Sequence, residues 1–178
     1  MLALLPARGW DDLNVLEICE RANVGRSTFY MHYRGKDDLL AEGLNDLRAH
    51  LGAAAIPAKA AQPLAFMAGL LQHMVEQRPV FRAVIGKRSG HVIERRFRDM
   101  VLQLVEDDFL QRGDAGWQQQ MAARYVAGAL VDVMAWWVDS PQAPTAQALE
   151  LRFRQLAETA LAGAPAGTAP PQGNITSR

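Results

Sequence analysis

Residues 24–40 read Val-Gly-Arg-Ser-Thr-Phe-Tyr-Met-His-Tyr-Arg-Gly-Lys-Asp-Asp-Leu-Leu, and this stretch decides the fold. Its first half, residues 26–33, is predicted to be a short helix that presents small polar, basic and aromatic side chains close together. A further helix is expected to begin at Lys36, and residues 13–22 upstream also have a helical pattern. Two helices joined by a tight turn, the second short and polar, form a helix-turn-helix, which places side chains in the major groove of DNA.

Local signals predict where the first helices begin and end. Asn14 and Glu17 fit a helix N-cap and its reciprocal partner three residues later. Gly9 and Asn23 are expected to close helices, because both residue types tolerate a positive φ. The apolar positions that recur with helical spacing, and so form one buried face, are Val15, Ile18, Cys19 and Ala22.

The rest of the chain also has helical periodicity, without strand-like alternation or an internal repeat. The predicted fold class is all-α: a three-helix helix-turn-helix head at residues 1–35 and a larger helical body at residues 36–162. Residues 163–178, rich in Ala, Gly and Pro, are expected to be a disordered tail. The helices predicted in the body are residues 36–52, 64–77, 80–85, 91–110, 117–139 and 146–161.

Composition limits the classes of function. The chain has 178 residues, 49% of them hydrophobic, which is enough for one large domain or two small ones. Its formal net charge is zero, so any contact with DNA depends on local groups. The single Cys19 excludes an internal disulfide, and no metal-ligand spacing is present. No secretory signal and no uninterrupted apolar stretch of membrane-spanning length is found, so a cytoplasmic protein without a membrane partner is expected.

Several strings in residues 8–44 have a recognisable order: Arg8-Gly9-Trp10, residues 15–24, residues 25–30, His32-Tyr33 and residues 35–40. Together they resemble the TetR family of bacterial one-component repressors. The strings most specific to this family are Thr28-Phe29-Tyr30 and, after it, Gly35-Lys36 with Leu39-Leu40. The remaining chain agrees in the number and length of its helices and in Trp136-Trp137 near the end of the penultimate helix. The resemblance implies a homodimer that binds a double-stranded DNA operator and is released from it by a small-molecule effector.

Three features depart from the family pattern. The basic arm that usually precedes the first helix is missing, because residue 1 falls inside that helix. Pro6 lies where a helix interior is expected, and proline there is unfavourable by about 3 kcal/mol. Gly25 replaces the usual hydroxyl N-cap, at an energetic cost of only a few tenths of a kcal/mol.

The predicted DNA contacts lie in and around the polar helix. Arg26 is expected to reach a guanine edge or a phosphate, and Tyr30 and His32 to donate to phosphates. Lys36, with the free amides of the next helix, suits a phosphate. The alternative for these predicted DNA contacts is that they are ordinary exposed side chains. Asn14 could equally be a helix cap only, and Thr28 could lie either in the core or on the DNA surface. The complete predicted set is Asn14, Arg26, Ser27, Thr28, Tyr30, His32 and Lys36.

Two further sites are predicted in the body. A mostly hydrophobic effector is expected in a cavity among separate helices, although ordinary core packing is the alternative for each residue: Met67, Leu70, Leu71, Met74, Phe81, Met100 and Tyr125. Dimerisation is expected through the last two long helices, at Gly128, Val131, Ala135, Trp136, Phe153 and Leu156.

Other functions have less support. No nucleophile–base pair, phosphate loop or metal cluster is present, so no enzyme activity, cofactor or metal is expected. The basic run at residues 78–98 is either a second phosphate surface or a solvated face. The main competing hypothesis is a helical ligand-binding or interaction protein that has lost DNA binding through its short first helix.

Overall fold

The computed structural model describes residues 1–59, 62–85, 91–110 and 116–162, and every regular element within them is helical. The all-α prediction is confirmed. A short 3-10 turn at Leu2–Leu4 comes first. The α-helices are α1 (Leu5–Asp12), α2 (Val15–Ala22), α3 (Arg26–His32), α4 (Lys36–Lys59), α5 (Phe66–Glu76), α6 (Arg78–Ile85), α7 (His91–Leu110), α8 (Trp117–Asp139) and α9 (Ala146–Ala162).

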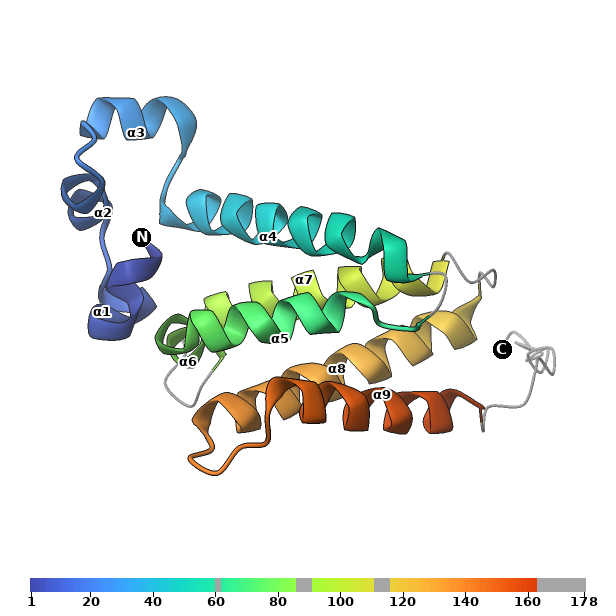
Figure 1. Ribbon diagram of the computed structural model, residues 1–178. Coiled ribbons are helices and arrows are strands. Elements are labelled where there is room, and N and C mark those ends of the chain that lie inside the picture. The colour runs from blue at the N-terminus through green and yellow to red at the C-terminus, as the bar shows by residue number, and fades with distance from the viewer. Residues whose placement is uncertain (60–61, 86–90, 111–115, 163–178) are drawn as a thin grey trace, which may run out of the picture.

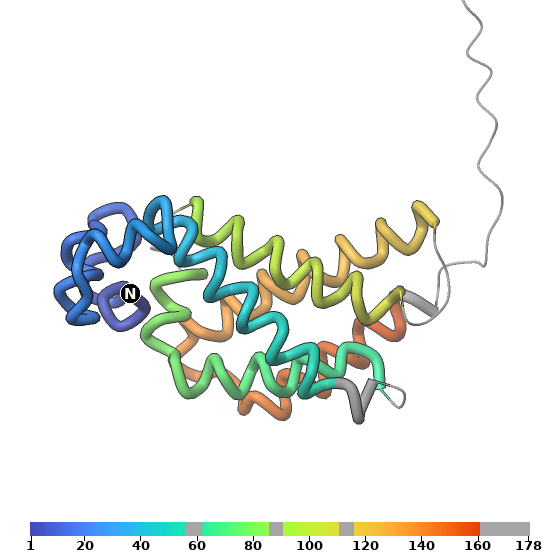
Figure 2. Tube along the Cα trace, turned by 90° about the horizontal axis from the view of Figure 1, so that it is seen from above, coloured from blue at the N-terminus to red at the C-terminus, as the bar shows by residue number. Residues whose placement is uncertain are grey.

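Helices α1–α3, here called the head, lie at one end of an elongated body made of α4–α9 (Figures 1 and 2). Helix α4 runs from the head along the body and packs against α5 and α7. Helix α1 packs against α6, so the head contacts the body at a second point as well. One continuous cluster of buried side chains extends from Leu5 and Trp10 in the head to Phe153 in α9. Head and body therefore share a hydrophobic core.

The local signals predicted for α2 are confirmed, and the one predicted at Gly9 is confirmed only in part. Asn14 and Glu17 form a complete capping box at the start of α2. Asn23 closes that helix with a φ of 53°, in the left-handed region that asparagine tolerates. Gly9, which was predicted to close a helix, lies within the bounds of α1 and kinks it there with a φ of 74°. The bounds of α7 and α8 coincide with the predicted ranges.

Other boundaries differ from the prediction. Pro6 lies in the first turn of α1, where its missing N–H has no helical partner to lose, so the expected proline penalty does not arise. Helix α4 continues to Lys59 instead of ending near Gly52, since three alanines follow that glycine and alanine has the highest helix propensity. Helix α5 begins only at Phe66, because Leu64 takes a φ of 58° and its amide donates to the Asp108 carboxylate at 3.1 Å.

Three of the five arginines that the structure describes in the basic stretch pair with other groups of the protein, whereas Arg95 and Arg96 are exposed. The Arg78 guanidinium donates to the carbonyls of Val138 and Ser140 at the end of α8, at 3.0 Å each. Arg82 pairs with Asp139 at 3.2 Å, and Arg98 pairs with Glu94 and Asp132. These pairings favour a structural role for the three paired arginines over a second phosphate surface. Lys87, Arg88 and the predicted tail at residues 163–178 lie outside the described residues.

Helix α8 is, by length and composition alone, long and apolar enough to cross a membrane, although Arg124 and Asp132 interrupt its apolar sequence. However, 44% of its apolar window is buried within the body. It packs against α6, α7 and α9, as a core helix of a bundle does. The apolar character of α8 is therefore weak support for a membrane span.

Candidate functional site

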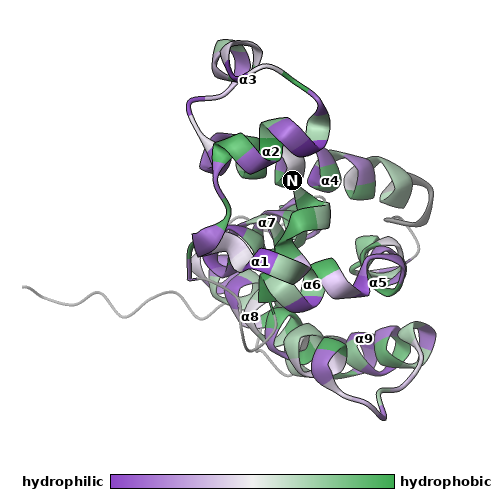
Figure 3. Cartoon of the chain, turned by 90° about the vertical axis from the view of Figure 1, so that its left-hand side faces the viewer, coloured by the Kyte–Doolittle hydropathy of each residue, from purple (hydrophilic) through white to green (hydrophobic). Residues whose placement is uncertain are grey.

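The recognition helix of the helix-turn-helix is α3, which lies at the outer edge of the head, away from α9 (Figure 3). Phe29 anchors it: this ring is buried and meets Tyr30 edge-on at 5.4 Å and Tyr33 at 5.3 Å between centroids. A seven-residue helix cannot be stable in water by itself, so this aromatic contact supplies what its propensity does not. With Phe29 turned inward, the opposite face of α3 is exposed.

The exposed face of α3 contains predicted DNA contacts. Arg26, Ser27 and Tyr30 are all exposed. Arg26 forms no ion pair with any residue in the part of the chain that the structure describes. A guanidinium at the first position of the helix, with its five donors unused, can reach a base edge or a phosphate.

Met31 is a residue that the sequence analysis missed. Its side chain is 80% exposed on α3, two positions after the buried Phe29 and hence on the other side of the helix. An apolar side chain fully open to water on a polar helix face is unusual. The available signal was helical spacing: once Phe29 is assigned to the core, Met31 has to face outward.

Asn14 serves as a cap in this structure. Its side-chain oxygen accepts from the amide of Glu17 at 3.0 Å, and the Glu17 carboxylate accepts from the amide of Asn14 at 3.2 Å. Arg8 adds an ion pair with Glu17 at 3.0 Å. Of the two alternatives for Asn14, the geometry directly shows the cap.

Lys36 has a role different from the predicted one. Its ammonium donates to the carbonyls of Trp10 at 2.7 Å, Leu13 at 2.8 Å and Asp11 at 3.3 Å, and lies 5.0 Å from the centre of the Trp10 ring. An ammonium has three donors, and all three point to these carbonyls. The predicted phosphate contact is at odds with this geometry, because Lys36 caps the C-terminal end of α1 and ties it to the start of α4.

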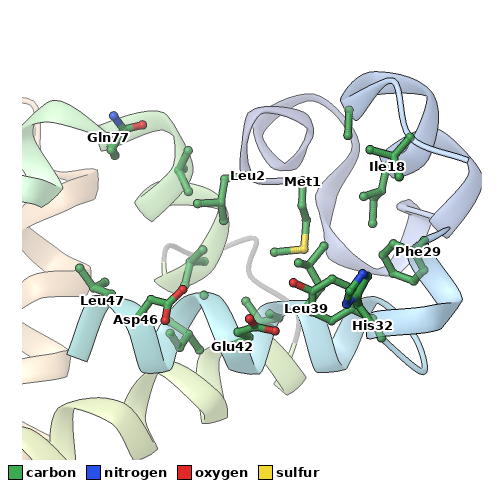
Figure 4. A pocket seen from close by; sticks show the side chains of 18 of the residues that line it. Met1, Leu2, Ile18, Phe29, His32, Leu39, Glu42, Asp46, Leu47 and Gln77 are labelled. Atoms are coloured by element: carbon green, nitrogen blue, oxygen red, sulfur yellow. The ribbon is translucent and has the colours of Figure 1, made fainter. Parts of the chain in front are cut away.

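A cavity of about 740 Å³ lies between the head and the body, and Figure 4 shows it from close by. Its head side includes Met1, Ile18 and Phe29, and α4 supplies a continuous stripe on another side. Thr28 and His32 also border it, which places two predicted DNA contacts at the edge of this space. The residues that line it from α4, α6 and α7 are mainly apolar: Leu39, Leu40, Gly43, Leu44, Leu47, Val80, Phe81, Val84 and Phe97.

The residues predicted for the effector site are mostly not in the walls of this cavity. Of the seven predicted residues, only Phe81 lines the cavity between head and body. Tyr125 is 61% exposed on α8, facing away from the interior. The other five are buried and belong to the continuous core: Met67, Leu70, Leu71, Met74 and Met100. Their long side chains fill the interior rather than line this space, since protein cores pack densely.

The polar groups around the cavity include Tyr33 and two carboxylates. Desolvation raises the pKa of Tyr33, and so do the neighbouring carboxylates of Glu42 and Asp46. Just outside, Asp38 accepts from the Arg34 guanidinium at 2.8 Å and from its amide at 3.0 Å. The Arg34 hydrogen bonds hold the pKa of Asp38 below its ordinary value.

Comparison with known proteins agrees with this architecture. Residues 2–42 match the family model of bacterial regulatory proteins, tetR family, and residues 62–159 match a model of the transcriptional regulator C-terminal region. The chain belongs to the TetR family. The second model alone spans more than half of the chain, and the two models together include both the head and the body. TetR-family proteins are DNA-binding transcriptional regulators rather than enzymes.

Solved structures share the TetR fold. A TetR transcriptional regulator from Streptococcus agalactiae aligns at a TM-score of 0.65 and 21% identity, covering 88% of each chain. A putative TetR-family regulator from Syntrophomonas wolfei aligns at 0.69 and 15% identity, covering 94% of this chain and 93% of its own. At these identities the likeness establishes the fold alone. No curated protein matches the chain in sequence.

The predicted TetR dimer surface separates into exposed and buried residues. Trp136 and Leu156 are more than half exposed, and Gly128 and Ala135 are partly exposed. Val131 and Phe153 are buried in the chain's own core, so their assignment to the interface was wrong; each faces inward on its helix. The exposed apolar residues of α8 follow one face instead: Trp117, Met121, Tyr125 and Trp136.

Proposed function

We propose that this TetR-family protein is a cytoplasmic transcriptional repressor that binds a double-stranded DNA operator as a homodimer and is released by a small, mostly hydrophobic effector. Residues 1–35 are the DNA-binding unit in this proposal, and residues 36–162 bind the effector and form the dimer. The observation that supports it most is the exposed face of α3, which is held outward by the buried Phe29.

The exposed side chains of α3 suit the major groove. Arg26 is the candidate for a bidentate contact to guanine, and Met31 offers an apolar surface to a thymine methyl group. Tyr30, Ser27 and His32 are candidates for phosphate contacts, which fix the position of the helix without reading sequence. Thr28 lies at the cavity edge of the same helix.

Dimerisation through α8 and α9 fits the exposed apolar surface. Trp136 and Tyr125 on α8, with Leu156 on α9, present large apolar groups to solvent. Burying such groups against a second copy is favourable by about 25 cal/mol for each Å² removed from water. A two-fold dimer places two copies of α3 on successive major grooves and so matches a palindromic operator.

The test is selection of operator sequences from random duplexes, followed by binding measurements on an Arg26→Ala variant. Loss of a bidentate base contact should weaken binding by about 1–3 kcal/mol and relax specificity at one position. Stability should change by no more than about 0.5 kcal/mol, because Arg26 is exposed.

Arg95→Ala is the matched control, since Arg95 is an exposed arginine on α7, outside both α3 and the proposed dimer helices. This variant should bind the selected operator like the wild type. If no sequence is enriched, the DNA-binding function is wrong. A helical ligand-binding or interaction protein would then be the better description. If a sequence is enriched but both variants bind it like the wild type, the Arg26 contact is wrong and the DNA-binding function stands.

A further inference from the structure

We propose that the cavity between head and body binds a small amphipathic organic cation, with its apolar part in the cavity and its positive charge at Glu42 and Asp46. The site differs from the effector position expected from the sequence. Its effect on DNA binding rests on the proposed regulator function, whereas binding itself does not.

The volume and the walls suit an organic molecule. A volume of about 740 Å³ lies within the roughly 300–1,000 Å³ of typical small-molecule sites. Aromatic rings come from opposite sides, with Phe29 in the head and Phe81 and Phe97 in the body. These walls favour an aromatic or branched aliphatic group.

Two carboxylates and one cationic group border the cavity: Glu42, Asp46 and Met1, whose amino group is positively charged, all line it, and the carboxylates leave its charge net negative. Glu42 and Asp46 are one helical turn apart on α4, and Figure 4 shows both beside the cavity. Neither carboxylate forms an ion pair with a lysine or arginine in the described parts of the chain, and no lysine or arginine lines the cavity. Two like charges near an apolar space raise the local concentration of cations and disfavour anions. Phe29 and Phe81 also line the cavity, and an aromatic ring attracts a cation that lies over its face.

Gly43 keeps this space open. It lies in the middle of the stripe formed on α4 by Leu39, Leu40 and Leu47, and it lines the cavity. A Cβ at Gly43 would meet no atom within 4 Å. Its backbone is helical, so a larger residue would fit without backbone strain, and at a position that lines the cavity it would reduce the space there.

An occupant of this cavity would touch both units of the protein. Ile18 and Phe29 belong to the head, whereas Leu40 and Val84 belong to the body. A bound molecule that prefers one arrangement of these walls would shift the population of head orientations toward it. In a dimer, a change in the orientation of the heads would change the spacing of the two α3 helices.

The binding test compares two probes of similar shape and opposite charge, tetraphenylphosphonium and tetraphenylborate. Affinity is measured by isothermal titration calorimetry on the full chain without DNA. We expect tetraphenylphosphonium to bind at least tenfold more tightly than tetraphenylborate. Glu42→Gln combined with Asp46→Asn should reduce this preference roughly tenfold, whereas Asp99→Asn with Glu158→Gln, the same charge change at exposed sites elsewhere, should not.

Gly43→Leu tests the location. This variant should be at least as stable as the wild type, because leucine is a better helix former than glycine, yet bind tetraphenylphosphonium at least tenfold more weakly. Gly52→Leu is its control: Gly52 is also in α4, a Cβ there also meets open space, and it does not line the cavity. Equal binding of the two probes, or unchanged binding by Gly43→Leu, would overturn the proposal.

The effect of the cation on operator binding is measured in a separate experiment. If the cation binds as expected but the selected operator is bound equally with and without it, the site stands and its regulatory role is wrong. If no operator exists, the calorimetric result still decides the site.

Discussion

Replacing Lys36 by methionine should destabilise the protein and leave its contacts with DNA phosphates unchanged. The Lys36 ammonium donates to three carbonyls at the end of α1, at 2.7–3.3 Å, and lies over the Trp10 ring. Methionine keeps most of the apolar stem and removes only the charged donor. The variant therefore isolates the link between α1 and α4.

The expected loss is about 2–3 kcal/mol. A hydrogen bond to a charged group contributes about 1.5–3 kcal/mol, and the three bonds share one ammonium, so their contributions do not add fully. The partial negative charge at a helix C-terminus adds about 0.3–1 kcal/mol, and the cation–π contact a similar amount. The entropy of ordering a long lysine side chain offsets part of this sum. For a chain of this length the midpoint of thermal unfolding should fall by roughly 5–10 °C.

The assay pairs urea unfolding, followed by circular dichroism, with the salt dependence of binding to duplex DNA. Arg26→Met is the reciprocal variant, since Arg26 is an exposed head cation without an ion-pair partner in the described chain. We expect Lys36→Met to lower the free energy of unfolding and to keep the salt slope of DNA binding. If Arg26 contacts phosphate, Arg26→Met should keep the free energy of unfolding and reduce the salt slope. Unchanged stability of Lys36→Met together with a salt slope reduced by about 0.9 would refute this reasoning and restore the phosphate contact.

Three other predictions follow from particular contacts. Arg78→Met should lower the free energy of unfolding by about 2 kcal/mol in urea titrations, because its guanidinium caps the end of α8, whereas Arg82→Met, which breaks only an exposed ion pair, should change it by less than about 1 kcal/mol. Trp136→Gln should weaken dimerisation at least tenfold in sedimentation experiments without changing the circular dichroism spectrum, since this ring is 55% exposed in the single chain. The pKa of Asp38 is lowered from 3.8 by its hydrogen bonds to Arg34, so these bonds stabilise the folded protein above pH 3.8. The stabilisation is lost as the pH falls below 3.8 through the folded-state pKa. Asp38→Asn should remove this part of the acid unfolding transition, as measured by circular dichroism.

Signals of short range allowed much of the fold to be predicted. The Asn14–Glu17 capping box spans three residues, and the closing role of Asn23 depends only on its own backbone. Helices α7 and α8 were predicted with correct bounds, since periodicity over twenty or more residues averages out local ambiguity. The extension of α4 past Pro57 was not predicted, because a proline normally marks a helix boundary.

The candidate site was harder to predict because its contacts are distant in sequence. The carbonyl partners of Lys36 are 23–26 residues away, and nothing near Lys36 in the sequence points to them. A lysine at a helix start has the same pattern whether its partner is a phosphate or a carbonyl. Similarly, the apolar pattern of α5 marks Met67 and Met74 as inward-facing but does not separate a cavity wall from a filled core.

The position of the cavity has a mechanical consequence. Lys36 ties the end of α1 to the start of α4, while α1 also packs on α6, so the head is attached on two sides of the same space. A molecule bound deep in the core would have to act on the head through α4 or α6, whereas one bound here touches the head directly at Ile18 and Phe29. Coupling by direct contact needs no intermediate element with two arrangements. It needs only a difference in affinity between two orientations of the head, and a tenfold difference corresponds to about 1.4 kcal/mol.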